Sequence, residues 1–313
     1  MTDFLSKVNT GTIMYKNENM IDEIIVGISS PCKELKRLIQ MVSKSKTNVL
    51  VLGETGTGKE LVAKAIHNES NRKGPLISVN CAAIPSELLE SELFGHEKGA
   101  FTGAVERRDG KFLAANSGSI FLDEIGDMSP SLQAKILRVL ESGEIERVGG
   151  AETIRVDVRI ISATNQNLEQ KISEGMFRQD LFHRINVFPI TVPPLRDRKE
   201  DVLPTAMSIL IHLKKKHNLL VDYISHDGVQ ALKEYDWPGN VRELENTLER
   251  VALIHDKSIL NVDDIKYILD ENQSPAKEEA TEPKPDPSII GDNIQREAVA
   301  TEETDNVFSG EIQ

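Results

Sequence analysis

The segment GETGTGKE, residues 53–60, restricts the possible folds of this 313-residue chain more than any other segment. It follows the β-rich run TNVLVLG (47–53) and precedes ELVAKAIHNES (60–70), whose apolar residues have helical spacing. Glycines between a strand and a helix let backbone N–H groups converge on a phosphate, and the helix N-terminus adds positive partial charge. The segment therefore predicts a phosphate-binding loop between a strand and a helix.

Strand-length apolar runs recur after this loop: PLISVNC (75–81), SIFLDEI (119–125) and VRIISATN (158–165). Amphipathic stretches such as SLQAKILRVLESGEI (131–145) separate them. This alternation favours an α/β fold, with a mostly parallel sheet covered by helices on both faces.

The β pattern ends after VPPLRDRKED (192–201), and three segments with helical spacing follow: VLPTAMSILIHLKKKH, HDGVQALKEY and NVRELENTLERVALIH. We therefore expect an α/β subdomain over residues 25–194 and a small helical subdomain over residues 195–270. Residues 1–24 are too few for a regulatory domain. Residues 271–313 contain eleven acidic and three basic residues and several prolines, so we expect an acidic, disordered tail.

The composition limits the classes of function. The hydrophobic content of 39% is enough for a core, and a net charge of −13 argues against a broad electrostatic grip on nucleic acid. Cys32 and Cys81 fit no metal-binding spacing and suit a reducing cytoplasm. The sequence has neither an apolar run of membrane-spanning length nor an N-terminal signal peptide, so we expect a cytoplasmic protein.

The phosphate-binding loop has one unusual residue. Gly53, Gly56 and Gly58 supply its flexibility, and Lys59 is expected to reach the β- and γ-phosphates. Glu60 occupies the place of the usual hydroxyl residue, so Mg²⁺ must be held through water or by other groups. A glycine-rich turn with an unrelated lysine is the alternative interpretation. The remaining loop residues assigned to nucleotide binding are Glu54, Thr55 and Thr57.

Two adjacent carboxylates, Asp123 and Glu124, end the apolar run SIFLDEI. Together with the phosphate-binding loop they predict a site for phosphoryl transfer, in which Asp123 holds Mg²⁺ and Glu124 polarises the attacking water. Taken alone, they would be read as solvated acids at the end of a strand.

The segment GHEKGAFTGAVERRDG (95–110) repeats at neither the strand nor the helix period, so we expect neither a buried strand nor a buried helix there. Phe101 lies among glycines and small residues, which leave the backbone free to move. Without further information the segment would be read as a surface loop.

Five motifs occur in a fixed order between about Val26 and His255: GETGTGKE, ELFGHEKGAFTGA, FLDEIGDM, FRQDLFHRINVFPI and WPGNVRELEN. Through these five motifs the chain resembles the AAA+ domain of sigma-54-dependent transcription activators, the bacterial enhancer-binding proteins. Glu60 after the lysine is usual in that family. The resemblance implies that the GAFTGA segment contacts the sigma-54 factor, with Phe101 and Thr102 at its tip. The implied contact residues are Gly99, Ala100, Phe101, Thr102, Gly103 and Ala104.

The resemblance also implies roles for single residues. Asn80 would restrain Glu124 until the γ-phosphate is sensed, and Thr164 and Asn165 would lie close to that phosphate. Arg178 and Arg184 would reach into the site of a neighbouring subunit, although as sequence they equally suit surface ion pairs. Further nucleotide contacts are assigned to Arg242 in the helical subdomain and to an adenine pocket formed by Ile25, Val26 and Gly27.

The sequence thus predicts an ATPase that uses ATP and Mg²⁺, assembles as a ring, by resemblance a hexamer, and remodels sigma-54 RNA polymerase to open promoters. One alternative is an AAA+ motor that acts on a different protein, as a chaperone does. Another is a DNA-binding module, but Glu243, Glu245 and Glu249 would repel phosphates. We also expect no sequence-specific DNA binding, because the acidic tail would repel DNA and SIIGDNIQREAVA (288–300) is too short for a DNA-reading domain. Because residues 1–24 are too few for a regulatory domain, we expect control in trans by a partner protein.

Overall fold

The computed structural model describes residues 20–254 and 257–273. The expectations for residues 1–19 and for the acidic tail after residue 273, including residues 288–300, lie outside the described residues. No helix in the described ranges is long and apolar enough to cross a membrane.

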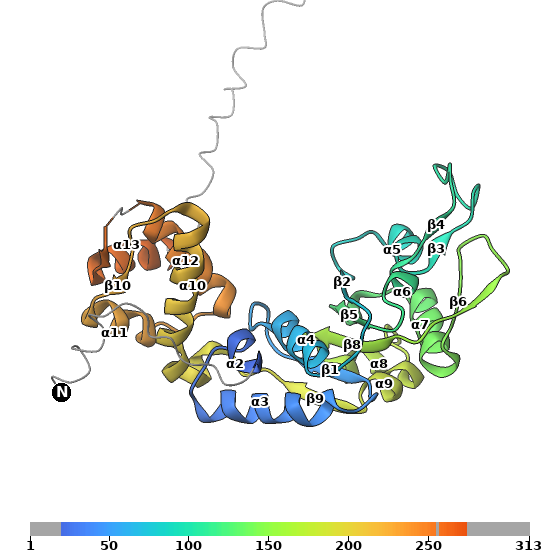
Figure 1. The fold of residues 1–313 in the computed structure, drawn as a ribbon, viewed down its shortest axis with the longest axis horizontal. Coiled ribbons are helices and arrows are strands. Elements are labelled where there is room, and N and C mark those ends of the chain that lie inside the picture. Colours follow the sequence, from blue (N-terminus) through green and yellow to red (C-terminus); the bar gives the residue numbers. More distant parts are fainter. Residues whose placement is uncertain (1–19, 255–256, 274–313) are drawn as a thin grey trace, which may run out of the picture. The chain divides into compact units, whose positions relative to one another are not determined.

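A parallel sheet of five strands forms the centre of the α/β part, in the order β2-β5-β8-β1-β9 (Figure 1). The strands are β1 (Val49–Leu52), β2 (Leu76–Asn80), β5 (Ser119–Asp123), β8 (Arg159–Thr164) and β9 (Phe188–Thr191). The α/β fold class is therefore confirmed. The sequence analysis did not identify β9 as a strand. Pro189 interrupts its pattern, and proline is tolerated there because β9 is an edge strand.

Helices cover both faces of the sheet. The side chains of β1, β2, β5 and β8 alternate between two apolar clusters, one on each face. In β1, Leu50 faces one cluster while Val49 and Val51 face the other. The Leu50 side packs against α5 (Ser86–Phe94), α6 (Lys111–Ala114), α7 (Pro130–Ser142), α8 (Leu168–Ser173) and α9 (Gln179–Ile185). The other side packs against α2 (Met20–Ile24), α3 (Ser30–Ser43) and α4 (Lys59–Asn68).

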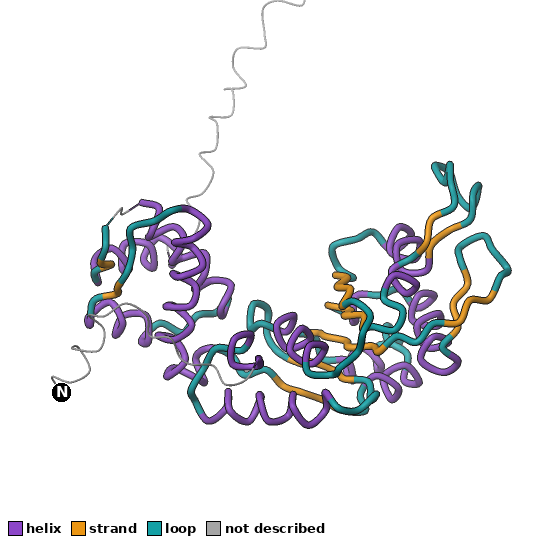
Figure 2. Tube along the Cα trace, viewed as in Figure 1, coloured by secondary structure: helices purple, strands orange, loops and turns teal. Residues whose placement is uncertain are grey.

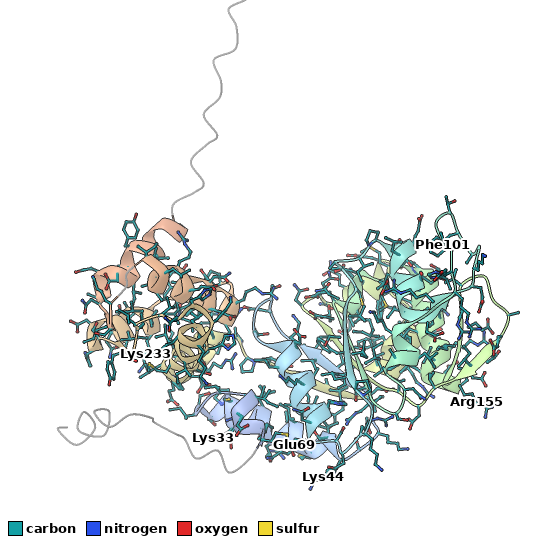
Figure 3. All side chains as sticks on the ribbon, turned by 45° about the horizontal axis from the view of Figure 1, so that its top comes forward. Lys33, Lys44, Glu69, Phe101, Arg155 and Lys233 are labelled. Carbon is teal, nitrogen blue, oxygen red and sulfur yellow. The ribbon has the colours of Figure 1, made fainter. Side chains whose placement is uncertain are left out.

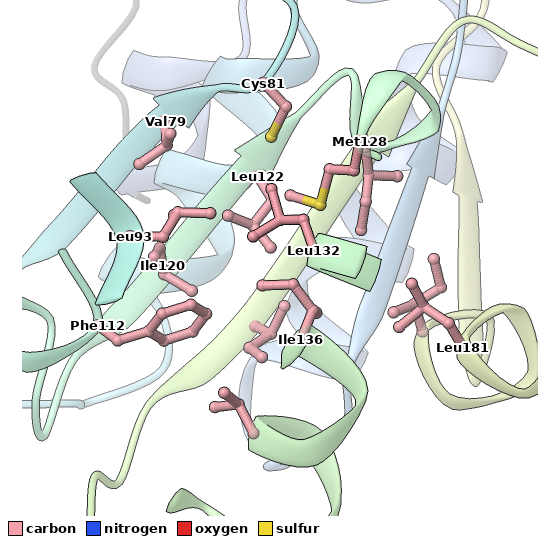
Figure 4. Close-up of a cluster of buried hydrophobic side chains, with 14 of the residues drawn as sticks. Val79, Cys81, Leu93, Phe112, Ile120, Leu122, Met128, Leu132, Ile136 and Leu181 are labelled. Carbon is pink, nitrogen blue, oxygen red and sulfur yellow. The ribbon is translucent and has the colours of Figure 1, made fainter. Parts of the chain in front are cut away.

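The cluster on the Leu50 side is drawn in Figure 4, where Ile120 and Leu122 of β5 lie close to Phe112, Leu132 and Ile136. All five side chains are at most 1% exposed. The buried strand β5 therefore has a fixed position, and so does the acidic pair at its end. The two cysteines, Cys32 and Cys81, are both buried and free.

Two short antiparallel hairpins extend the α/β part: β3 (Gly95–His96) with β4 (Arg108–Asp109), and β6 (Glu144–Glu146) with β7 (Thr153–Arg155). The expectation of no buried strand in residues 95–110 is wrong at its ends. Gly95 and His96 are buried strand residues that pair with Asp109 and Arg108. Two-residue strands are too short for a period to be visible in the sequence.

The chain after β9 is mainly helical (Figure 2). Three predicted helices are present as α10 (Val202–His217), α11 (His226–Glu234) and α12 (Asn240–Ile254). The sequence analysis missed the two-residue parallel pair of β10 (Tyr223–Ile224) with β11 (Ile259–Leu260) and the helix α13 (Val262–Gln273). The 3₁₀ segment η2 (Leu195–Asp201) precedes this part, and a shorter one, η1 (Ile125–Asp127), follows β5.

Trp237 is the centre of the helical part's core. Its side chain is fully buried, its indole N–H donates to the Leu232 carbonyl over 2.7 Å, and its ring meets Tyr235 edge-on. It packs with leucines and valines of α10 and α12, so this part has a core of its own.

We expect Trp237→Ala to lower the free energy of unfolding of the helical part by about 3–5 kcal/mol, because a large buried ring leaves a cavity. Urea denaturation followed by circular dichroism measures this. Tyr267→Ala removes an aromatic side chain that is 57% exposed and is the control, with an expected effect below about 0.5 kcal/mol. Equal midpoints for the Trp237 variant and the wild type would contradict the assignment of this core.

Candidate functional site

The phosphate-binding loop, residues 53–59 (the P-loop below), joins β1 to α4, as the sequence predicts. Gly56 and Gly58 have φ values of +78° and +99°, a backbone region that favours glycine. A Cβ on Gly56 would lie 2.2 Å from the carbonyl oxygen of Gly239, whereas a Cβ on Gly58 would have no atom closer than 3.8 Å. Gly56 is thus needed for the close approach of the helical part, and Gly58 for the turn into α4.

Lys59 is the first residue of α4, and its side chain is only 6% exposed. Its ammonium group donates to the carbonyl oxygens of Gly53 (3.1 Å) and Glu54 (3.4 Å) and pairs with Glu124 over 3.4 Å. A buried ammonium group needs such partners. The P-loop lysine is therefore beside the acidic pair at the end of β5, whereas Glu60 points to solvent.

The acidic pair has an unfavourable electrostatic setting. Burial, and then the neighbouring Glu124, raise the pKa of Asp123 above its usual value. Glu124 follows the strand with φ +52° and ψ +49°, a left-handed conformation that is rare for glutamate. Strain and crowded negative charge of this kind are concentrated at functional sites. Among the described residues, no cluster of three or more His, Cys, Asp or Glu side chains could hold a metal ion.

The end of β8 completes this group of residues. The backbone N–H of Asn165 donates to the second carboxylate oxygen of Glu124 (3.2 Å). The side-chain amide of Asn165 donates to the Thr55 hydroxyl (2.9 Å). Thr164 is fully buried, and its carbonyl oxygen accepts from Gly53 N–H over 3.3 Å. The structure thus brings the P-loop, the acidic pair and the two residues expected near the γ-phosphate together.

Asn80 does not make the expected contact. It pairs in register with Asp123, but its side-chain oxygen accepts from the N–H groups of Ala82 and Ala83, both over 3.0 Å. The Glu124 carboxylate bonds to Lys59 and Asn165 instead. In this structure Asn80 therefore stabilises the turn after β2 and does not restrain Glu124.

The segment that follows the expected adenine pocket, Ile25, Val26 and Gly27, is held by a buried acid that the sequence did not reveal. Asp201 is fully buried and accepts from Ile28 N–H (2.6 Å), Ser29 N–H (2.7 Å) and the Ser29 hydroxyl (2.6 Å). A Cβ on Gly27 would collide with Cys32 and Asp201. Ile25 is 5% exposed and belongs to the apolar cluster on the face of the sheet covered by α2, α3 and α4, whereas Val26 is half-buried.

Arg198 was also missed. Its side chain is 5% exposed, its Nη2 donates to the Thr57 carbonyl over 3.1 Å, and its Nε is buried without a hydrogen-bond partner. Arg198 and Asp201 lie in VPPLRDRKED, which the sequence analysis used only as a boundary between subdomains. A charged run is normally a solvated surface, so only burial reveals these two residues.

The helical part meets the P-loop through the start of α12. The backbone N–H groups of Val241 and Arg242 donate to the Gly56 carbonyl over 3.0 and 3.3 Å. The side chain of Arg242, the expected second sensor, is exposed. The structure therefore brings the Arg242 backbone to the P-loop.

Arg178 and Arg184 are not part of this group of residues. Both side chains are exposed at α9, and Arg178 forms an ion pair with Asp180 over 2.7 Å. Arg178, Gln179, Asp180 and His183 line a surface depression. Neither arginine forms a hydrogen bond or ion pair with the P-loop or with the acidic pair in the described chain.

The GAFTGA segment, residues 99–104 (the contact loop below), lies at the end of the β3–β4 hairpin, and Figure 3 labels Phe101 there. Phe101 is 39% exposed, and its ring meets that of buried His96 edge-on at 5.0 Å. Gly99 N–H donates to the Ala104 carbonyl over 2.8 Å, and Ala104 is buried. The loop is therefore a closed turn, and the Phe101 ring packs on His96 at the base of the hairpin. The φ values of Gly99 and Gly103 are +82° and +105°.

The β6–β7 hairpin, marked by Arg155 in Figure 3, braces the contact loop, which the sequence analysis did not foresee. Val148 N–H donates to the Gly95 carbonyl over 2.9 Å, and Gly149 lies against Ala100. Arg147 is 5% exposed and pairs with three carboxylates, those of Asp109 (2.9 Å), Glu152 (3.2 Å) and Glu97 (3.4 Å). One guanidinium group therefore joins the two hairpins.

We expect Arg147→Met to loosen the contact loop, because it removes the buried cation that Asp109, Glu152 and Glu97 share. Hydrogen–deuterium exchange should become faster across residues 95–110. Arg155→Met is the matched control: it removes an exposed arginine of the same hairpin that forms an ion pair with Glu144, and it should leave that exchange unchanged. Equal exchange in the Arg147 variant and the wild type would show that this ion-pair group does not hold the loop.

Comparison with known proteins agrees with this geometry. Residues 25–191 match the family described as "Sigma-54 interaction domain", and residues 196–282 match the "AAA+ ATPase lid domain". The chain is similar to the Nif-specific regulatory protein of Klebsiella pneumoniae, with 51% identity over 246 residues, which are 78% of this chain and 47% of that protein. It is 44% identical to the anaerobic nitric oxide reductase transcription regulator NorR of Klebsiella pneumoniae, covering 88% of this chain and 55% of NorR. The chain thus spans about half the length of the curated relatives it matches.

Among solved structures the fold is similar to that of NtrX from Brucella abortus in complex with ADP, with a TM-score of 0.73 and 36% identity over 85% of this chain and 60% of that one. A structure of NtrX in complex with ATP gives a TM-score of 0.72 and 37% identity, covering 82% of this chain and 57% of that one. The helical part after β9 therefore corresponds to an AAA+ lid.

Proposed function

Since the chain belongs to the family of sigma-54 interaction domains, we propose that it hydrolyses ATP and thereby remodels sigma-54 RNA polymerase, so that promoter DNA opens. The observation that carries this proposal is the contact of Lys59 and Asn165 with the Glu124 carboxylate, directly beside the P-loop. A lysine, a carboxylate that can act as base and a strand-end amide, held within hydrogen-bond distance of one another, are what phosphoryl transfer to water requires.

The residues present fit ATP as the substrate. The P-loop precedes the N-terminus of a ten-residue helix, α4, whose free N–H groups and dipole favour a phosphate. Apart from the two chain neighbours of Gly58, no backbone atom lies within 4 Å of the position of a Cβ on this glycine, where the nearest atom is the Leu61 Cδ1 at 3.8 Å. The buried Arg198 Nε has no hydrogen-bond partner among the described residues, and the same guanidinium group donates to the carbonyl of the P-loop residue Thr57. The relatives crystallised with ADP and ATP support the same nucleotide.

Asp123 suits a Mg²⁺ ion that is shared with the substrate. Burial, and then the neighbouring Glu124, raise the pKa of Asp123, and a bound cation would offset both effects. With no third acidic or histidine ligand beside it in the described ranges, the remaining ligands would be phosphate oxygens and water, as is usual for Mg²⁺. When bound, the ion would offset the charge that develops on the phosphates.

Glu124 would act as the base that orients and polarises water. While its carboxylate bonds to Lys59 and Asn165, both of its oxygens are occupied. A γ-phosphate competes for the Lys59 ammonium group, and this competition would free one carboxylate oxygen to accept from water. The Asn165 N–H keeps the other oxygen in place. We therefore assign to Lys59 and Asn165 the restraint on Glu124 that was expected of Asn80.

Arg178 and Arg184 would act on the site of a neighbouring copy of this chain. Their exposure, and the lack of a bond to the P-loop of their own chain, support a role in trans. An arginine that stabilises transition-state charge contributes roughly 10³–10⁵ in rate in comparable phosphoryl transfers. ATP hydrolysis would then require a ring, for which we propose a hexamer by resemblance.

The contact loop would transmit nucleotide state to sigma-54. Phe101 and Thr102 are exposed at the end of a hairpin, while the glycines on both sides have open space around them. An aromatic side chain on such a support is a usual anchor for a protein partner. The alternative, an AAA+ motor that remodels a different protein, would use the same ATP site but would not need this loop sequence.

Glu124→Gln should keep nucleotide binding and abolish turnover, because the amide keeps the shape of the side chain and loses its basicity. ATP binding by isothermal calorimetry and phosphate release measure the two properties. Asp127→Asn, at an exposed carboxylate three residues further along, is the control and should hydrolyse ATP as the wild type does. Hydrolysis at the wild-type rate in the Glu124 variant would refute the role of Glu124.

Thr102→Ala should keep ATP hydrolysis, because the contact loop is separate from the P-loop. It should lose sigma-54 binding, because Thr102 is one of the two residues proposed to contact sigma-54. Binding is measured by co-sedimentation with sigma-54 in the presence of ADP and aluminium fluoride. Lys98→Ala, exposed just before the loop, is the control and should bind. A Thr102 variant that binds sigma-54 normally would favour a different protein partner.

A further inference from the structure

Glu54, the second residue of the P-loop, forms an ion pair outside the phosphate cradle. Its two carboxylate oxygens accept from the two terminal nitrogens of Arg196 in η2, over 2.8 and 2.5 Å. Asn240, the first residue of α12, donates to the same carboxylate over 3.1 Å. These donors, with Arg196 the stronger, lower the pKa of Glu54 to about 2. The carboxylate is therefore ionised at neutral pH and bound from two sides by residues of the lid region.

Asn240 joins three segments that are far apart in the sequence. Its side chain is fully buried and its φ is +55°, which is unusual for a residue other than glycine. The amide nitrogen donates to Glu54 and to the Thr55 carbonyl (3.1 Å), while the amide oxygen accepts from Leu195 N–H (2.8 Å). A buried polar side chain with this many partners restricts the relative positions of the P-loop, η2 and α12.

The P-loop backbone adds to this contact. The Gly56 carbonyl accepts from two N–H groups in the first turn of α12, which would otherwise have no partner within the helix. The carbonyl thus takes the place of a helix cap. Residues 54, 55 and 56 consequently all bond to the lid region, and they are the residues next to those that would hold the phosphates.

We propose that Glu54 is a positioning residue that fastens the lid to the P-loop, and that its contacts with Arg196 and Asn240 determine how long ADP or ATP stays bound. This inference rests on the ATP site proposed above. When a phosphate enters the loop, residues 55–58 adjust around it, and Glu54 passes that adjustment to η2 and α12. Breaking the pair allows the lid to separate from the P-loop, and nucleotide leaves faster.

The pair is partly exposed, with side-chain exposures of 43% for Glu54 and 40% for Arg196, so a moderate effect is expected. We expect Glu54→Ala and Arg196→Ala each to raise the dissociation rate of nucleotide by roughly three- to tenfold. KM for ATP should rise with it, whereas kcat at saturating ATP stays within about twofold, because neither side chain bonds to Glu124 or Asp123. The double variant should be no worse than Glu54→Ala, since that single variant already removes the contact with Arg196.

The experiment uses the full chain and ADP carrying a fluorescent methylanthraniloyl group, with dissociation followed by stopped-flow fluorescence and ATP turnover measured in parallel. The matched control is the ion pair of Arg37 with Glu34 on α3, which also has two hydrogen bonds, is exposed and lies outside the P-loop and lid. Arg37→Ala should leave the dissociation rate unchanged. Thermal unfolding of each variant shows that it is folded.

Exchange of the two charges, Glu54→Arg with Arg196→Glu, should recover a slower dissociation rate than either single charge reversal gives. A role in folding alone would not produce such a recovery together with a change in KM at constant kcat. Dissociation at the wild-type rate from Glu54→Ala, or additive effects in the double variant, would overturn the proposal. A different result would refute the proposed ATP site itself: no binding of the labelled ADP by either the wild type or the Lys59→Ala variant.

Discussion

The ammonium group of Lys59 is the interaction on which the rest of the site depends. It is 6% exposed and is held by two P-loop carbonyl groups and the Glu124 carboxylate. Moving it would leave a buried charge without partners, which is costly. The lysine therefore fixes the distance between the P-loop and the end of β5. In the function proposed above, its ammonium group binds either the Glu124 carboxylate or a phosphate, which would give the site two states. A site with two states can pass the presence of nucleotide on to other parts of the molecule.

Two other regions depend on this centre in different ways. The lid is joined to the outer side of the P-loop through Glu54, Gly56 and Asn240, which are next in sequence or in space to the phosphate-binding residues. The contact loop is carried by a hairpin between α5 and α6, whose core residues Leu93 and Phe112 pack in the same cluster as β5. The strand that carries the acidic pair and the helices that flank the hairpin therefore share one buried cluster.

The contact loop is more restrained than its glycines suggest. His96 packs against Phe101, and Arg147 joins the β3–β4 and β6–β7 hairpins through three carboxylates. Flexibility is then confined to the turn at Gly99 and Gly103, while the base of the hairpin is fixed. Such a construction presents an aromatic side chain at a defined position and lowers the entropy lost on binding.

The sequence by itself determined the α/β class, the P-loop between β1 and α4, the acidic pair after β5 and three of the lid helices, because each is encoded by local periodicity or adjacent residues. It did not reveal β9, whose Pro189 is acceptable only at a sheet edge, nor the short β3–β4 hairpin. Tertiary structure alone decided the partners of charged residues. Arg196 meets Glu54 across 142 positions, Arg147 meets Asp109 across 38, and Asp201 is buried against Ser29. Only the tertiary structure shows that Asn165, and not Asn80, contacts Glu124. A charged side chain is normally solvated, and only folding shows which few are buried and against what.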